Sequence, residues 1–260
     1  MRNNTYIICI TLVATLGGLL FGYDTAVISG AEQALQKHMG LDDVWHGLTV
    51  SSALIGCVIG SALSGSFASS LGRRDSLRVA ALLFFLSALG SAYPEFPFFE
   101  KGDTSFALIL MFNFYRIIGG IGVGLASAIC PMYIAEIAPS DIRGKLVSCN
   151  QFAIIFGMLV VYFVNYSIKA SITEEVLITD GWRYMFLSGA VPAALFGVLL
   201  FFIPRTPRFL VMTGRHEAAL AVLQRVNGEE RAHAILKEIQ SVSKEKKEKL
   251  LTYGLTVVIV

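Results

Sequence analysis

Long runs of apolar residues, separated by short polar segments, occupy most of the first 203 residues of the chain. A helix needs about 20 apolar residues to cross a ~30 Å hydrocarbon layer. Six runs reach or approach this length, so the pattern predicts six membrane-spanning helices. They are Tyr6–Ser29, Gly47–Leu71, Leu77–Tyr93, Phe106–Ala135, Leu146–Ile168 and Trp182–Ile203.

After Ile203 the chain becomes polar in character. Thr206-Pro207 is typical of a helix start, with proline at the first helical position, and Gly214 and Asn227-Gly228 indicate breaks between helices. We therefore expect short amphipathic helices on the cytoplasmic face, followed by a solvated charged run at 244–249. A new apolar run starts near Leu250.

These changes predict three units along the chain. Residues 1–203 form a six-helix transmembrane bundle, residues 204–249 a cytoplasmic helical linker, and residues 250–260 the start of a truncated seventh span. The glycines of the spans favour close helix contacts, because small residues let membrane helices approach. The pairs four residues apart are Gly18 and Gly22, Gly56 and Gly60, and Gly120 and Gly124.

Composition supports a membrane protein and argues against several other classes. The chain is 55% hydrophobic and 15% charged, against about 25% charged in soluble domains. The net charge of +2 gives no reason to expect nucleic acid. The four cysteines and four histidines show no metal-ligand spacing. Because no nucleophile–base pair or phosphate loop is present either, we expect no enzyme activity, no metal and no cofactor.

The distribution of lysine and arginine predicts the orientation. The loops on one side of the six spans hold nine of these residues, and the loops on the other side hold four. Cytoplasmic loops carry the excess of positive charge. Both ends of the six-helix unit are therefore expected in the cytoplasm, with the protein in the inner membrane.

Two ionisable side chains interrupt the spans, Asp24 in the first and Arg116 in the fourth. A charge at the centre of a membrane helix costs about 2.5–3.5 kcal/mol, so such groups usually face a watery cavity or each other. The first span runs outward and the fourth inward, which places both residues at similar depth. We expect an ion pair that is either a static packing contact or, preferably, a proton site. Burial favours the neutral acid, whereas the guanidinium favours the carboxylate.

A stripe of six residues at spacings of three and four shares one face of the fifth span. They are Ser148, Gln151, Ile155, Met158, Tyr162 and Asn165. An amide offers two donors and two acceptor lone pairs, which suits paired sugar hydroxyls. Gln151 is thus a candidate sugar ligand, with an interhelical hydrogen bond as the alternative. Phe21 lies on the same helical face as Asp24, where its ring would stack on a pyranose.

Several motifs resemble the sugar porter family of the major facilitator superfamily. They are Gly17–Asp24, Arg116–Gly124, Pro131–Glu136, Arg143–Lys145 and Asn150–Phe152. The resemblance covers nearly the whole chain and looks closest to bacterial D-xylose/proton symporters. It implies an all-α membrane protein, the N-terminal six-transmembrane-helix half of a major facilitator fold plus short cytoplasmic amphipathic helices.

The family resemblance also implies roles for individual residues. Asp24 would be the proton-coupling acid and Arg116 its partner, while Gln151 would hydrogen-bond the sugar and Phe21 would line its site. A cytoplasmic gate would hold the outward-open state shut below. Its ion pairs would involve Arg73, Arg74, Glu136 and Arg143.

Four positions depart from the family pattern. Met158 stands where D-xylose porters of this type have a second sugar-binding glutamine, and a thioether donates no hydrogen bond. Ser69 replaces the usual acid before Gly-Arg-Arg, and Gly189 stands where some symporters carry another carboxylate. Arg205 replaces the glutamate of the Pro-Glu-[Ser/Thr]-Pro-Arg motif, which reverses a charge and is expected to weaken the gate.

The expected function is proton-coupled symport of a D-xylose-like pentose or hexose by alternating access. Family members have a second six-helix half, and a half-transporter cannot enclose a substrate between two halves. We therefore expect transport to require a C-terminal six-helix half besides sugar, protons and lipid bilayer. The alternatives are a truncated, non-transporting membrane protein and a facilitative uniporter, whose relatives tend to have a neutral amide at the position of Asp24.

Overall fold

The computed structural model describes residues 4–96 and 105–258, and their side chains as far as residue 244. All regular structure in these ranges is helical. The five long helices of the first part are α1 (Asn4–Met39), α2 (Asp43–Ser70), α3 (Arg73–Ala92), α4 (Phe106–Ile137) and α5 (Arg143–Ser171). The remaining elements are α6 (Glu174–Val176), the π-helical turn η1 (Leu177–Gly181), α7 (Trp182–Ser188), α8 (Ala190–Leu199), α9 (Pro207–Met212), α10 (His216–Asn227) and α11 (Glu229–Val258).

Within residues 4–96 and 105–258, six helical stretches are long and apolar enough to cross a membrane, which confirms the number of spans predicted. Their bounds differ from the apolar runs by a few residues at most ends and by more at two of them. Helix α1 continues past Ser29 to Met39, and the sixth stretch is Glu174–Leu199 rather than Trp182–Ile203. The acidic pair Glu174 and Glu175 suits the positive end of a helix, which favours the earlier start.

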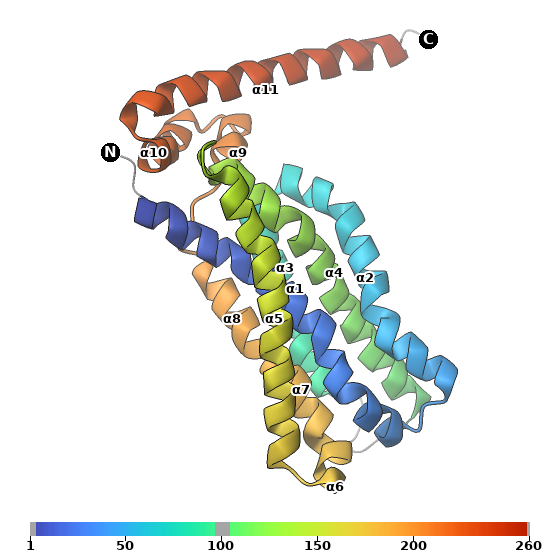
Figure 1. Cartoon of the computed structure of the whole chain (residues 1–260). Coiled ribbons are helices and arrows are strands. Elements are labelled where there is room, and N and C mark those ends of the chain that lie inside the picture. The colour runs from blue at the N-terminus through green and yellow to red at the C-terminus, as the bar shows by residue number, and fades with distance from the viewer. Residues whose placement is uncertain (1–3, 97–104, 259–260) are drawn as a thin grey trace.

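The spanning helices lie side by side, and α9, α10 and α11 gather at one end of this bundle, where α1 also starts (Figure 1). Helix α10 packs on the first turns of α1, since Val226 is buried in the same apolar cluster as Ile7. The helix start at Pro207 and the breaks at Gly214 and Gly228 lie where the sequence predicts them. Helix α11 differs from the expected short helices, because it runs unbroken for 30 residues across the predicted boundary at 249/250.

Glycines bring pairs of spanning helices into direct backbone contact. A Cβ atom at Gly56 of α2 would overlap the carbonyl group of Ile117 in α4, and one at Gly120 of α4 would overlap the carbonyl of Ala53 in α2. Gly22 of α1 meets a backbone carbonyl of α5 in the same way. Close approach of this kind drives helix association in lipid, where hydrophobicity contributes little. The predicted packing role of these glycines is confirmed.

Two apolar clusters fill the bundle. One surrounds Phe84, Ile129 and Phe196 toward the end covered by α9–α11. The other surrounds Phe112 and Trp182 toward the opposite end. Leu20 belongs to the first cluster and Tyr23 to the second. The boundary between the two clusters therefore lies directly before Asp24, an acidic residue in the middle of α1.

Candidate functional site

Asp24 and Arg116 form an ion pair inside the bundle, as their predicted depth requires. The Nη1 atom of Arg116 lies 2.9 Å from Oδ1 of Asp24, and Nη2 donates to the backbone carbonyl of Asp24 at 3.4 Å. The Arg116 side chain is 1% exposed and that of Asp24 is 17% exposed. The guanidinium also lies over the ring of Phe186, 5.3 Å from its centroid. A charge this deeply buried depends on its partner, so the state of Asp24 affects Arg116 directly.

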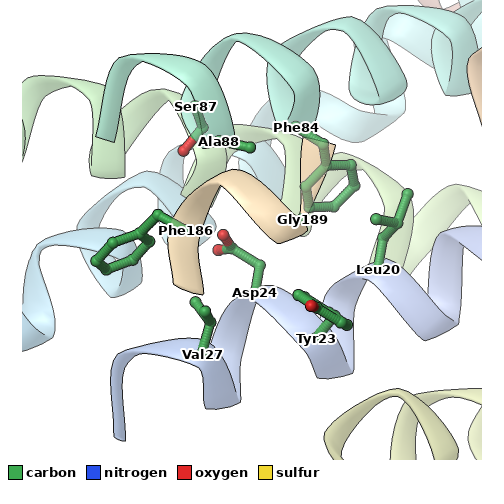
Figure 2. A pocket seen from close by; sticks show the side chains of 9 residues that line it. All are labelled: Leu20, Tyr23, Asp24, Val27, Phe84, Ser87, Ala88, Phe186 and Gly189. Atoms are coloured by element: carbon green, nitrogen blue, oxygen red, sulfur yellow. The ribbon is translucent and has the colours of Figure 1, made fainter. Parts of the chain in front are cut away.

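The second oxygen of the Asp24 carboxylate is not engaged by Arg116. Oδ2 of Asp24 is buried and has no hydrogen-bond partner among the described protein atoms. It borders a small cavity between α1, α3 and the α7–α8 segment (Figure 2). The carboxylate of Asp24 rises from α1 toward α3, and the hydroxyl of Ser87 lies on α3 across from it (Figure 2). No sequence pattern singles out Ser87 or Tyr23. The hydroxyl of Tyr23 hydrogen-bonds that of Ser188 at 2.7 Å.

The residues predicted to bind sugar lie on two helices. Gln151 is exposed on α5, Met158 is half-buried on α5, and Phe21 is half-buried on α1. The members of the predicted stripe on α5 differ in burial. Asn165 is buried and donates to the carbonyl of Val27 at 3.2 Å, so this member of the stripe holds α5 to α1 instead. Gln151 makes no such interhelical bond among the described residues, and its amide is available on the outer face of α5.

The predicted gate is only partly assembled. Arg73 and Glu136 form a buried ion pair of 2.7 Å that joins α3 to α4. Arg74 lies 3.0 Å from Asp75, its neighbour in the chain. Arg143 is exposed and donates to the carbonyl of Ala138 at 3.4 Å, so it does not pair with Glu136 in the described structure. The expected four-residue network is therefore one interhelical pair with two arginines beside it.

Asp75 was not predicted as part of this region, yet three guanidinium groups converge on it. Arg205 lies 2.6 Å from one of its oxygens, and Arg78 and Arg74 lie 2.9 and 3.0 Å from the other. The reversed charge at Arg205 is thus compensated locally. Ser69 takes no part, because its hydroxyl bonds to the Ser66 carbonyl of its own helix. The position of Asp75 directly after two arginines was the available signal.

A second buried ion pair lies at the opposite end of the bundle. Arg183 bonds both oxygens of Glu95, and it donates to the carbonyl of Ala92 at 2.9 Å. Its guanidinium lies 4.3 Å from the ring centroid of Trp182. The sequence singles out neither residue, because Glu95 follows the third predicted span and Arg183 lies at the start of the sixth. Their burial follows from contacts between α3 and α7, which the sequence does not show.

Six candidate spanning helices with an interior acid–arginine pair fit one half of a major facilitator fold. The family described as "Sugar (and other) transporter" matches residues 10–258. The chain belongs to this family. It is accordingly an all-α, multi-pass membrane protein, as the sequence motifs indicated.

Individual relatives give the same result. The chain is 50% identical to the D-xylose-proton symporter of Escherichia coli (strain K12), over 99% of this chain and 56% of the relative. It is 42% identical to the arabinose-proton symporter of Bacillus subtilis (strain 168), over 91% and 48%. A solved structure of the proton:xylose symporter XylE bound to 6-bromo-6-deoxy-D-glucose superposes with a TM-score of 0.91 at 49% identity, covering 97% of this chain and 57% of that one. The chain thus spans about half the length of the relatives it matches.

Proposed function

We propose that this chain is the N-terminal half of a proton-coupled sugar symporter that works by alternating access. The observation that carries the proposal is the buried Asp24–Arg116 pair at 2.9 Å. Ionisable groups inside membrane spans mark ion or proton paths by default. The names of the relatives, a D-xylose-proton and an arabinose-proton symporter, support a pentose or a similar hexose as the sugar.

Coupling follows from the geometry of the pair. Arg116 engages Oδ1 of Asp24, while Oδ2 has no partner among the described protein atoms, so Oδ2 is the atom that would accept a proton. Protonation removes the negative charge from beside a guanidinium that is 1% exposed. A buried charge without its counter-charge is strongly disfavoured. The helices must then rearrange to give Arg116 new partners, which links proton binding to a change of conformation.

The sugar site in this proposal comprises Gln151, Met158 and Phe21. The exposed amide of Gln151 has donors and acceptors for sugar hydroxyls. Met158 would contact the sugar without donating a hydrogen bond, and the ring of Phe21 would stack on it. All three belong to α1 and α5, so the remaining walls must come from a C-terminal six-helix half.

The further assignments form part of the same proposal. Residues 1–203 are the transmembrane bundle, 204–249 a cytoplasmic linker and 250–260 the start of a seventh span. Both ends of the six-helix unit would face the cytoplasm of an inner-membrane protein. The cytoplasmic gate would consist of Arg73, Arg74, Glu136 and Arg143. The Arg73–Glu136 ion pair at 2.7 Å supports one contact of this gate.

The test is Asp24→Asn in the complete transporter that contains this chain, reconstituted in liposomes. We expect loss of sugar accumulation against a gradient with retention of sugar exchange, because exchange needs no net proton movement. Asp43→Asn is the matched control, since Asp43 is exposed at the start of α2. An unchanged accumulation in Asp24→Asn would instead favour a uniporter. Proton-dependent xylose uptake by this chain alone would contradict the assignment as a half.

A further inference from the structure

Two buried serines of α3 differ from the other buried serines of the bundle. Ser52, Ser64 and Ser76 each donate to a backbone carbonyl three or four residues earlier in the chain, at 2.7 to 2.9 Å. Ser87 and Ser91 are 1% and 0% exposed, yet their hydroxyls have no hydrogen-bond partner among the described protein atoms. A buried polar group without a partner costs free energy, and an ordered water is the usual way to satisfy it.

These hydroxyls lead from the proton-coupling acid toward the end of the helix. Ser87 borders the cavity that contains Asp24. Ser91 lies one turn further along the same face of α3, about 5–6 Å away between Cβ atoms. Helix α3 ends directly afterwards at Ala92, whose carbonyl accepts from Arg183. The series Asp24, Ser87, Ser91 therefore runs from the interior to the end of the bundle opposite α9–α11.

The cavity has the size and the chemistry of a site for one water molecule. The space in which the centre of a water molecule can lie has a volume of about 10 Å³. One ordered water needs about 10–15 Å³ of such space. Two buried polar atoms face it without a protein partner, Oδ2 of Asp24 and Oγ of Ser87. Gly189 forms part of the wall of this cavity.

We propose that a buried water in this cavity and the hydroxyls of Ser87 and Ser91 form the route by which a proton reaches Asp24. The inference rests on the proposed function. Water and serine hydroxyls both donate and accept hydrogen bonds. Ser87 and Ser91 do not hydrogen-bond each other, so a second ordered water bridges their hydroxyls in this route. Each oxygen along the route, of water or of serine, accepts one proton on a lone pair and releases its own to the next oxygen. The last transfer converts the Asp24 carboxylate to the acid at Oδ2, and the relay groups are left unchanged.

The test measures two rates in the complete transporter reconstituted in liposomes. One is the initial rate of sugar-driven proton entry, followed with a trapped pH dye, and the other is sugar exchange at equal concentrations. Gly189→Ala adds a methyl group at the wall of the cavity, where its Cβ would lie 3.6 Å from the Tyr23 ring and 3.3 Å from the Phe186 carbonyl. Ser91→Ala removes a hydroxyl from the route. Ser76→Ala is the matched control, because Ser76 is buried on the same helix.

We expect Gly189→Ala and Ser91→Ala each to slow proton entry about tenfold or more, since a positioned proton-transfer group typically contributes about 10²–10⁴ in rate. Exchange should stay near the unmodified rate in all three variants, which also shows that they fold. Proton entry like that of Ser76→Ala would overturn the inference, and so would equal slowing of exchange and proton entry. If the unmodified transporter shows no sugar-driven proton entry, the proposed function itself fails.

Discussion

The ion pair between Arg183 and Glu95 allows a quantitative test of how the end of the bundle opposite α9–α11 is held together. Arg183→Met removes the guanidinium and keeps much of the side-chain volume. It leaves the Glu95 carboxylate, 9% exposed, without its bidentate partner, and it deprives the Ala92 carbonyl of a donor at 2.9 Å. The pair links the segment after α3 to α7, so its loss acts on contacts between two spans.

The expected cost follows from burial. Removing one partner of a buried ion pair destabilises a protein by about 3–5 kcal/mol. For chains of this size each kcal/mol lowers the melting temperature by about 2–4 °C, which gives a decrease of about 6–20 °C. Asp180 also loses a neighbour at 3.6 Å, but its side chain is 35% exposed and contributes little.

The assay is thermal unfolding of the purified chain in detergent, followed by tryptophan fluorescence. Trp182 lies beside Arg183 and reports on this region. Arg208→Met is the control, because Arg208 is exposed. The double variant Arg183→Met/Glu95→Gln should recover most of the loss, since no buried charge remains. A decrease below about 2 °C for Arg183→Met, or strictly additive effects in the double variant, would refute the reasoning.

Three further predictions concern other regions. Gly120→Val should destabilise the α2–α4 contact by about 1–3 kcal/mol or more in thermal unfolding, whereas Gly65→Val, which has open space around it, should not; equal effects would contradict the packing argument. Met158→Gln in the complete transporter should tighten xylose binding about 2–10-fold in a competition assay, the worth of one hydrogen bond, and unchanged affinity would remove Met158 from the site. Asp75→Ala should lower the melting temperature more than Ser69→Ala does, because three arginines lose a common partner; similar shifts would show that the arginine cluster is solvated.

The number and order of the spans could be predicted because the bilayer imposes a length and a composition on each of them. The ends of the spans could not be predicted as well. Helix α1 continues to Met39 since Ala31, Ala34 and Leu35 pack against other helices, a tertiary effect that an apolar run does not show. The sixth span starts with the short α6 and the π-helical turn η1 instead of a regular helix, and the apolar run does not indicate either of them.

The site shows a similar division. The contact between Asp24 and Arg116 followed from depth alone, because two interior charges at one level have few other partners. The role of Asn165 could not be predicted by periodicity, since a spacing of three and four residues does not say which neighbour a face meets. Ser87 carries no sequence signal at all. Its interest comes from an unpartnered hydroxyl beside a cavity, which only packing reveals.

The ion pairs also limit how a gate can work in the proposed cycle. Arg73–Glu136 joins α3 to α4, and both side chains are 10% exposed. A pair within one six-helix unit stabilises that unit, but it cannot by itself hold two units together. Arg143 is the member of the predicted gate that is exposed and that bonds a carbonyl instead of an acid. In alternating access the bonds that break must cross between the two units. If the proposed C-terminal half is present, Arg143 is therefore the member of the proposed gate best placed to pair with an acid of that half, while Arg73 and Glu136 keep α3 joined to α4.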